Sequence, residues 1–257
     1  MIINKRVITC LRYPGGKFYG YNKIRSLLET EHSEYIELFL GGASVFLGKK
    51  LVKDNWLNDI DKNLINFYQV IAKESTAKQL YKLLENEYVD KIRYEEVKNF
   101  VPRDDIERAY KYFYMNRTSF SGIMFKPRWG YRIGSSVTPE YWIDRIKPVA
   151  TKLKDIKITS LDFRELLNKS SKNSLIYADP PYYKASKNIY NNEFNAKDHL
   201  DLMNALKNIN GKFILSYNRH SEIKDMYSWA NIKEESWVYY MSGAKRDEGK
   251  ELIITNF

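Results

Sequence analysis

Residues 35–51, "YIELFLGGASVFLGKKL", give the clearest indication of the fold class. Its first part, residues 35–40, predicts a buried strand, and Gly41 and Gly42 then allow a tight turn. From Ala43 to Leu51 the apolar residues recur at helical spacing. A strand, a glycine turn and a helix in this order indicate the first half of a nucleotide-binding βαβ unit.

The next segment, "NWLNDID" at residues 55–61, predicts a short strand that ends at Asp59, followed by an amphipathic helix over residues 64–85. Asp59 lies 18 residues beyond Gly41, a spacing that suits an acid accepting hydrogen bonds from a ribose. A full GxGxxG motif, which pyrophosphate binding needs, is missing. The expected ligand is therefore a nucleoside without phosphates. A plain turn followed by a helix-capping aspartate is the alternative interpretation.

Strands and helices alternate again after residue 152, and such alternation predicts a largely parallel sheet. We expect strands at 156–163, 174–181, 212–218, 232–241 and 250–257, with helices at 164–170, 196–209 and 221–230. Between residues 88 and 152 the alternation stops. An α/β domain that carries a helical insertion is the simplest architecture.

The insertion is basic and aromatic. No Asp or Glu lies between Arg108 and Pro139, and the whole chain has a formal net charge of +10. Six cations and eight aromatic residues alternate in this window, which is typical of a nucleic-acid surface. The cluster "YKYFY" at residues 110–114 lies at helical spacing and is expected in the core, whereas residues 117–134 are expected to form a loop.

Composition narrows the class of protein. Hydrophobic residues make up 44% of the chain, which excludes disorder, and no apolar run is long enough to cross a bilayer or to serve as a secretory signal. Cys10 is the only cysteine, so an intramolecular disulfide is impossible and a reducing compartment is expected. We therefore expect a cytoplasmic protein without membrane partners.

A second decisive stretch is "LIYADPPYYK", residues 175–184, in which an apolar strand delivers Asp179 to a double-proline corner. Pro180 and Pro181 end the strand and hold the following backbone rigid. An amine attached to an aromatic ring is a poor nucleophile. The Asp179 carboxylate and a neighbouring carbonyl can each accept one of its N–H groups and so aim its lone pair, while Tyr182 stacks on the aromatic ring that carries the amine. The alternative is an ordinary Asp-Pro turn.

Two shorter motifs also admit two interpretations. "RYPGGK" at residues 12–17 is either a simple turn before a helix or part of a ligand site. "LDF" at residues 161–163 could hold an adenine between Asp162 and Phe163, or Asp162 could only cap the helix that follows.

The ordered set of motifs resembles the Dam-like (D12 class) family of DNA adenine N6-methyltransferases over residues 11–257. The motifs are RYPGGK, YIELFLGGASVF, LNDIDKNLINFY, MNRTSFSG, SLDF, LIYADPPYY, KFILSYN and KELIITNF. The resemblance implies a Rossmann-like class I methyltransferase sheet, mostly parallel with one antiparallel strand. It implies a catalytic domain at 1–66 and 153–257, and a mainly helical target-recognition insertion at 67–152.

The resemblance also implies the site residues. S-adenosylmethionine, which becomes S-adenosylhomocysteine with no metal involved, is expected to bind Tyr13, Pro14, Gly15, Gly16, Lys17, Glu37, Phe39, Gly41, Gly42, Ala43, Asp59, Ile60, Asp162, Phe163 and Asp179. Catalysis is expected from Asp179, Pro180, Pro181 and Tyr182 on an adenine flipped out of double-stranded DNA. DNA is expected to contact Asn116, Arg117, Ser119, Phe120, Lys126 and Arg128.

The motifs depart from the family at two places. Tyr13-Pro14 stands where Trp-Ala is frequent, and Phe120-Ser121-Gly122 replaces an aromatic-Asn-Gly run of many GATC-methylating relatives, so the target sequence is left open. Restriction–modification with a cognate endonuclease, a phage role and a solitary role in bacteria are all compatible with the sequence. So are a monomer and a weak dimer.

Other activities fit the residues less well. Enzymes that methylate cytosine N4 usually carry Ser where Asp179 stands. Methylation of cytosine C5 needs a cysteine nucleophile, which Cys10 does not supply. Enzymes that methylate protein glutamine carry Asn-Pro-Pro-Tyr instead. Methylation of RNA adenine is possible in principle. A catalytically inactive DNA-binding relic of the same fold is the alternative from a different class.

Overall fold

The computed structural model describes residues 9–17, 20–184, 194–239 and 247–257. Contacts between Cα atoms divide the chain into two compact units. The helical unit comprises Met1–Phe18, Gly41–Gly48 and Lys62–Ile156, and the sheet unit comprises Tyr19–Leu40, Lys49–Asp61 and Lys157–Phe257. The domain limits at residues 66 and 153 that the resemblance implies stay a prediction.

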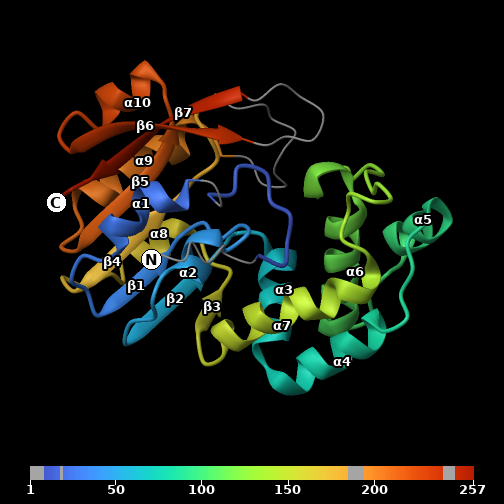
Figure 1. The fold of residues 1–257 in the computed structure, drawn as a ribbon. Helices are drawn as coiled ribbons and strands as arrows, with labels where there is room; N and C mark the ends of the chain where they lie inside the picture. Colours follow the sequence, from blue (N-terminus) through green and yellow to red (C-terminus); the bar gives the residue numbers. More distant parts are fainter. Residues whose placement is uncertain (1–8, 18–19, 185–193, 240–246) are drawn as a thin grey trace, which may run out of the picture. The chain divides into compact units, whose positions relative to one another are not determined.

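The sheet unit is built on a seven-stranded sheet (Figure 1). Its strands are β1 (Glu34–Glu37), β2 (Asp54–Asn58), β3 (Lys157–Thr159), β4 (Ser174–Ala178), β5 (Lys212–Asn218), β6 (Asn231–Tyr239) and β7 (Asp247–Thr255). They lie in the order β3-β2-β1-β4-β5-β7-β6. Five strands are parallel, and β7 pairs antiparallel with both β5 and β6. The predicted fold class, with its antiparallel strand next to the sheet edge, is confirmed.

One large buried cluster of the sheet unit lies on one face of the sheet. Alternate residues of the strands, such as Ile36 in β1, Ile176 in β4 and Leu215 in β5, contact the helices on that face in one buried cluster. The helices of this unit are α1 (Tyr21–Leu28), α8 (Phe163–Leu167), α9 (Ala196–Lys207) and α10 (Ser221–Met226). Burial of these apolar side chains holds α8, α9 and α10 against the strands.

The parallel register brings the carboxyl ends of five strands to one side of the sheet. Glu37 of β1 lies opposite both Leu57 of β2 and Tyr177 of β4. The pairing continues past β1, since the Leu40 N–H donates to the Asn58 carbonyl at 2.8 Å. Loops that follow parallel strands at this side are where α/β sheets bind ligands.

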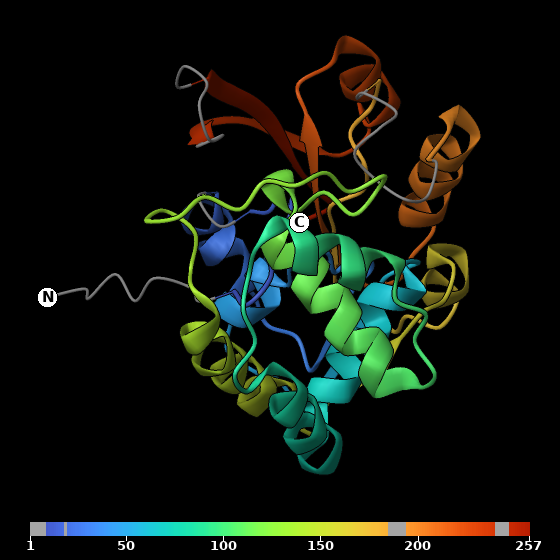
Figure 2. The ribbon, with the colours of Figure 1, turned by 90° about the vertical axis from the view of Figure 1, so that its right-hand side faces the viewer.

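The helical unit packs around α3 and α6 (Figure 2). Its helices are α2 (Ser44–Gly48), α3 (Lys62–Ala72), α4 (Glu74–Leu84), α5 (Lys91–Asn99), α6 (Asp105–Thr118), η1 (Phe120–Gly122), η2 (Pro139–Tyr141) and α7 (Trp142–Leu153). Phe113 of α6 stacks on Phe67 of α3 at 5.5 Å between ring centroids and meets Trp142 edge to face. The expectation that the "YKYFY" aromatics lie in the core is confirmed, because all four are buried.

Two predicted boundaries in the helical unit are wrong. The expected helix at 64–85 is two helices, because Lys73 has an extended backbone and the Thr76 hydroxyl donates to the carbonyls of Val70 and Lys73. The expected loop at 117–134 begins later, because α6 continues through Thr118.

Boundaries in the sheet unit shift by a few residues, as strands end sooner than the apolar runs suggest. The strand at 212–218 is reproduced in full as β5. The last two residues of the strand predicted at 232–241 lie outside the described residues. In the part of the chain that the structure describes, no helix has the length and apolarity needed to cross a membrane.

Candidate functional site

The glycine turn that follows β1 in sequence contacts Tyr13 within the helical unit. A Cβ on Gly41 would lie 2.8 Å from a ring carbon of Tyr13, and a Cβ on Gly42 would lie 2.9 Å from the Tyr13 Cβ. Gly41 also has a φ of +47°, which favours glycine. Its carbonyl accepts a hydrogen bond from the Tyr68 hydroxyl at 2.9 Å. Only glycine fits both positions, so the turn and Tyr13 form one closely packed wall.

The segment around Tyr13 forms a tight turn of its own. Gly15 has a φ of +74°, and the Gly16 N–H donates to the Tyr13 carbonyl at 3.2 Å. The Lys17 side chain is buried, and its ammonium lies 3.4 Å from the Gly15 carbonyl, which accepts from it. The structure thus brings Tyr13, Gly41 and Gly42 together, as expected for parts of one site.

In the sheet unit, two acids stand at the ends of adjacent strands. Glu37 ends β1 and accepts a hydrogen bond from the Tyr35 hydroxyl at 2.6 Å. Burial, reinforced by Glu37, raises the pKa of Tyr35. Asp59 follows β2, is 7% exposed and accepts a hydrogen bond from the Asp61 N–H at 3.0 Å. Its neighbour Ile60 is exposed.

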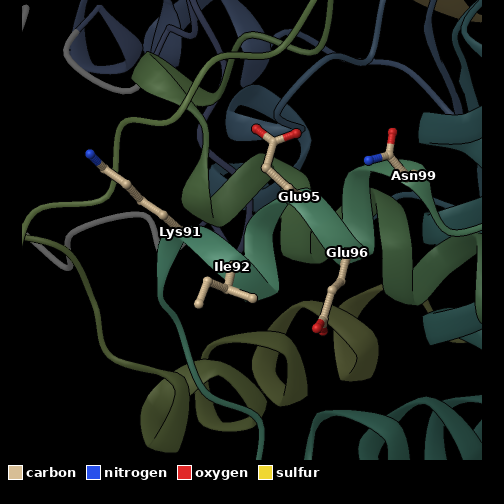
Figure 3. Close-up of a pocket in the computed structure, with 5 residues that line it drawn as sticks. All are labelled: Lys91, Ile92, Glu95, Glu96 and Asn99. Carbon is tan, nitrogen blue, oxygen red and sulfur yellow. The ribbon is translucent and has the colours of Figure 1, made fainter.

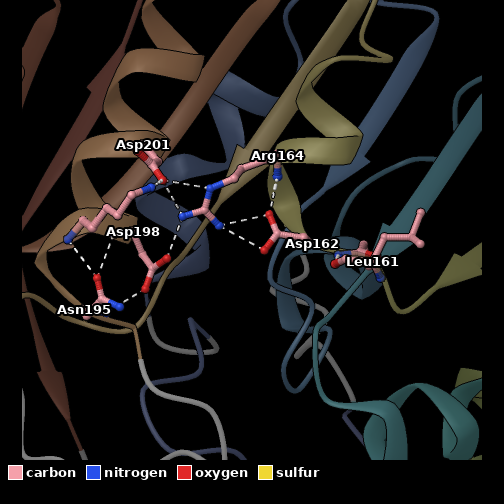
Figure 4. Close-up of polar contacts among 8 residues, drawn as sticks. Leu161, Asp162, Arg164, Asn195, Asp198 and Asp201 are labelled. Atoms are coloured by element: carbon pink, nitrogen blue, oxygen red, sulfur yellow. Dashed lines mark hydrogen bonds and ion pairs between the residues drawn. The ribbon is translucent and has the colours of Figure 1, made fainter.

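Asp162 lies after β3 and is anchored on both sides. The buried Asn58 side chain donates to the Leu161 carbonyl at 2.9 Å and accepts from the Leu161 N–H at 2.9 Å. The Asp162 carboxylate caps α8 through the Arg164 N–H and also accepts from the Arg164 guanidinium at 3.0 Å (Figure 4). The capping role considered for Asp162 is therefore present.

Arg164 extends this anchor to α9. Its guanidinium donates to Asp198 at 2.6 Å and to Asp201 at 2.7 Å, and Figure 4 shows the three carboxylates around it. Such charge-assisted bonds fix a planar guanidinium in one orientation. Arg164 thereby holds the Asp162 carboxylate at the edge of the sheet.

Three aromatic rings meet beside Asp162. Phe39 follows β1, Phe163 opens α8 and Phe194 precedes α9, and the centroid distances are 5.8 Å for Phe39–Phe163, 5.6 Å for Phe39–Phe194 and 5.8 Å for Phe163–Phe194. A carboxylate next to a group of rings suits a flat heterocycle that carries an amine.

The double-proline corner is held by two other strands. Asp179 is half-buried and Pro180 is buried at the end of β4. The Tyr182 hydroxyl donates to the carboxylate of Glu251 on β7. Asn218, the last residue of β5, accepts from the Tyr183 N–H at 3.0 Å and donates to the Tyr183 carbonyl at 3.1 Å. The backbone after the prolines is thus fixed by side chains as well as by the rings of proline itself.

A buried histidine supports the same corner. His199 of α9 lies 2.5 Å from the Tyr217 hydroxyl, and its ring meets Tyr183 edge to face at 5.0 Å. Burial lowers the pKa of His199 to about 4, so the ring is neutral near pH 7. Burial, together with the charges of Tyr227 and Asp179, raises the pKa of Tyr217.

The loop after α6 is closed at its base. Ser119 forms an isolated antiparallel bridge with Trp129, and the Gly130 N–H donates to the Thr118 carbonyl at 2.9 Å. Gly130 packs against the Phe120 backbone so closely that a Cβ would lie 2.2 Å from its Cα. We call residues 119–130 the recognition loop.

The six residues predicted to contact DNA divide into two groups. Phe120 is 42% exposed, and Lys126 and Arg128 are exposed on the recognition loop. Asn116 and Ser119 are fully buried, and Arg117 is 6% exposed. Direct contact of all six with DNA stays a prediction, and the surface positions favour the first group.

Arg117 is a buried cation that forms no ion pair with a carboxylate among the described residues. One of its terminal nitrogens lies 3.4 Å from the Cys10 carbonyl, and its Nε has no hydrogen-bond partner in the part of the chain described. Burial, with the like charges of Arg12 and Arg145, lowers its pKa to about 10. Arg117 therefore adds positive potential beneath the recognition loop.

Three residues of the site were not predicted from sequence: Asn218, Glu251 and Arg164. The first two lie in motifs that the resemblance includes, KFILSYN and KELIITNF, but a strand sequence alone does not show which side chain faces the corner. Arg164 directly follows the "LDF" motif, and its spacing from Asp162 was the available signal.

A shallow depression on α5 lies away from these residues (Figure 3). Its lining residues are Lys91, Ile92, Glu95, Glu96 and Asn99, all from one helix. Glu95 and Glu96 already pair with Lys98 and Arg93. None of the predicted site residues lines it. Among the described residues, no group of three or more His, Cys, Asp or Glu side chains is arranged to hold a metal ion.

The sequence of the chain is similar to those of known proteins. The sequence model of the D12 class N6 adenine-specific DNA methyltransferases matches residues 13–241. The chain is 25% identical to the type II methyltransferase M.CviBI of Paramecium bursaria Chlorella virus NC1A, over 96% of this chain and 98% of the viral one. It is 25% identical to the type II methyltransferase M.MjaIII of Methanocaldococcus jannaschii, with the same coverage. The DNA adenine methylase of Vibrio cholerae is 30% identical over 67% of this chain and 64% of its own.

Proposed function

Because the chain belongs to the D12 class of N6 adenine-specific DNA methyltransferases, we propose that it methylates N6 of an adenine flipped out of duplex DNA, with S-adenosylmethionine as donor. The observation that carries this proposal is the corner at Asp179. A carboxylate ends a buried strand there, Asn218 clamps the backbone beyond it, and Glu251 holds the Tyr182 side chain.

The residues present fit the donor. In the helical unit the ring of Tyr13 packs directly on Gly41 and Gly42, which leaves no room for a Cβ at either glycine and joins two motifs assigned to the donor by the resemblance. In the sheet unit Asp59 suits ribose hydroxyls, and Asp162 beside the three phenylalanine rings suits adenine. We propose that these residues, together with the other cofactor residues implied by the resemblance, bind S-adenosylmethionine. When bound, the donor supplies a methyl carbon made electrophilic by its sulfonium.

The chain's own contribution to the chemistry is positioning and electrostatics. The Asp179 carboxylate and the Pro180 carbonyl each accept one N–H of the target amine, which turns the nitrogen lone pair away from the ring. The Tyr182 ring stacks on the base, while its hydroxyl stays bound to Glu251. Because the corner is anchored before substrate arrives, little reorganisation is needed during the reaction.

DNA binding is proposed for the exposed part of the recognition loop. Phe120 offers an apolar ring to the base stack, and Lys126 and Arg128 offer cations to phosphates or to a guanine edge. Flipping the base costs a few kcal/mol of unstacking, which pocket contacts offset. The buried Arg117 supports the same role through its positive charge.

The proposal is tested by expressing the chain in a bacterial host that lacks adenine methylation and sequencing the genomic DNA at single-molecule resolution. We expect N6-methyladenine at one recurring short sequence, and none in a host that expresses Asp179→Ala. Unmodified DNA from the wild-type chain, despite duplex binding, would identify an inactive relic. N4-methylcytosine at the recurring sequence would instead identify the N4 amine of cytosine as the methyl acceptor.

A further inference from the structure

Arg12, the residue before Tyr13, is tied to the end of α6 by a buried carboxamide. The Asn116 Oδ1 accepts from the Arg12 N–H at 2.9 Å, and the Asn116 Nδ2 donates to the Arg12 carbonyl at 2.8 Å. Asn116 is 0% exposed. One side chain therefore satisfies both backbone groups of Arg12, as a neighbouring strand would.

The side chain of Arg12 reaches the base of the recognition loop. Its guanidinium donates to the Ser119 carbonyl at 3.2 Å and to the Arg117 carbonyl at 3.4 Å. Burial and the nearby charge of Arg132 lower the pKa of Arg12. Backbone carbonyls at the loop base thus take the place of a carboxylate for this half-buried cation.

Gly122 of the recognition loop touches Arg12 directly. Its φ is +71°, and a Cβ on it would lie 2.5 Å from the Arg12 carbonyl oxygen and 2.6 Å from the Arg12 Cβ. The Gly122 carbonyl also accepts from Asn116 at 3.3 Å. Loop, helix end and Arg12 therefore form one contiguous set of contacts.

The same contacts continue into the proposed cofactor site. Tyr13 follows Arg12 by one peptide bond and packs on Gly41 and Gly42 with no room to spare. A shift of Arg12 must therefore move Tyr13 or the glycine turn, because closely packed interiors do not absorb such shifts.

We propose that Asn116, Arg12 and Gly122 couple the recognition loop to the cofactor segment at residues 12–17. Asn116 acts as a positioning residue: DNA that displaces the loop changes the affinity for the cofactor, and the cofactor changes the affinity for DNA by the same factor. This inference rests on the proposed assignment of Tyr13, Gly41 and Gly42 to S-adenosylmethionine.

The first test compares two glycines of similar backbone conformation. Gly122 has a φ of +71° and Gly134 a φ of +79°, but a Cβ on Gly134 meets nothing within 4 Å. Alanine at either position carries a similar backbone strain, and only Gly122→Ala collides with Arg12. The affinity for S-adenosylhomocysteine is measured by titration calorimetry on the DNA-free proteins, well below their unfolding temperatures.

We expect Gly122→Ala to raise the Kd for S-adenosylhomocysteine by about tenfold, and Gly134→Ala to change it by less than about twofold. Equal Kd values in the two variants would overturn the coupling. A purely structural role for Gly122 would lower Tm while leaving the Kd of the folded protein unchanged, which is also a negative result.

The second test removes the hydrogen-bond donor of Asn116, and it tests the coupling if Gly122→Ala does not fold. Asn116→Asp keeps the acceptor for the Arg12 N–H and loses the donor to the Arg12 and Gly122 carbonyls. Asn256 offers a matched control, because its carboxamide accepts from the Phe213 N–H and donates to the Gly211 carbonyl in the sheet unit.

The Kd for S-adenosylhomocysteine is measured with and without duplex DNA of the methylated sequence. We expect DNA to change this Kd by about fivefold or more in the wild type and in Asn256→Asp, and by less than about twofold in Asn116→Asp. If DNA changes the Kd by the same factor in all three proteins, the coupling is overturned while the proposed function stands. A wild type that binds no S-adenosylhomocysteine would instead overturn the proposed function.

Discussion

The double-proline corner and the recognition loop are both irregular segments that follow a regular element, yet they are held in different ways. The corner after β4 is anchored through the side chains of Glu251 and Asn218, which reach it from two other strands. The recognition loop after α6 is anchored near its base, by backbone hydrogen bonds, by the close approach of Gly130 and by the side chains of Arg12 and Asn116. Its outer residues Lys126 and Arg128 are exposed.

The difference suits the two roles that we propose for these segments. Transfer to an amine requires a lone pair aimed to within a fraction of an ångström, and a corner that is rigid before substrate binds meets this requirement. Recognition of a DNA sequence requires exposed side chains that meet bases and phosphates, and an anchored loop base would fix their register.

The largest expected effect is at Asp179. Asp179→Ala removes one of the two acceptors for the target amine, so we expect methylation of duplex DNA to fall by about a thousandfold or more. Cofactor binding should change little. Asp225, an exposed acid on α10, supplies the control Asp225→Ala. Turnover near the wild-type rate in Asp179→Ala would show that the double-proline corner does not carry the catalytic step.

Acid should loosen the corner through His199. The folded-state pKa of about 4 lies below the ordinary histidine value of about 6.5, so the unfolded chain binds more protons between these pH values. The contribution of His199 to stability is complete above a pH of about 6.5 and is lost as the pH falls towards the folded-state pKa of about 4.

Urea unfolding of wild type and His199→Gln between pH 4 and 7 measures this contribution. We expect the free energy of unfolding to depend less steeply on pH in the variant. Parallel pH curves for the two proteins would show that His199 does not titrate with the corner.

Removing the Asn218 clamp should separate catalysis from stability. Asn218→Ala loses both hydrogen bonds to Tyr183, so we expect kcat to fall by about tenfold to a hundredfold and stability by about 2 kcal/mol. Asn256→Ala loses an equivalent pair of backbone bonds elsewhere in the sheet unit. If both variants lose stability and activity equally, the clamp contributes only to folding.

The smallest effect is expected at the exposed loop. Arg128→Ala should weaken discrimination between target and altered sequences by about tenfold, the contribution of one side chain to base or phosphate contacts. Cofactor affinity should be unchanged. Lys82, exposed on α4, gives the matched charge control Lys82→Ala. Sequence preference identical to wild type would remove Arg128 from the residues that read DNA.

Much of the sheet unit was predictable from residues alone. Apolar runs and glycine or proline breaks located the strands, and β5 was placed in full, because burial on both faces leaves a strong signal in sequence. The helix at 64–85 was misjudged because an amphipathic pattern continues across Lys73, where a threonine hydroxyl satisfies the carbonyls and allows the chain to bend.

Within the candidate site, the motifs predicted which acids and glycines take part, but not which side chains contact them. The pairing of Tyr182 with Glu251, 69 positions apart, depends on the antiparallel register of β7 against β5. The burial of Asn116 beneath a loop that the sequence marks as DNA-binding depends likewise on where Arg12 lies.

The class of chemistry could be inferred from the residues alone, because several local motifs, each ambiguous when taken singly, follow one another in an order that resembles one family of methyltransferases. Only the tertiary structure decided which side chains hold those features in place. Hydrogen bonds such as those of Asn116, Asn218 and Glu251 join segments remote in sequence, and folding alone brings their donors and acceptors within reach.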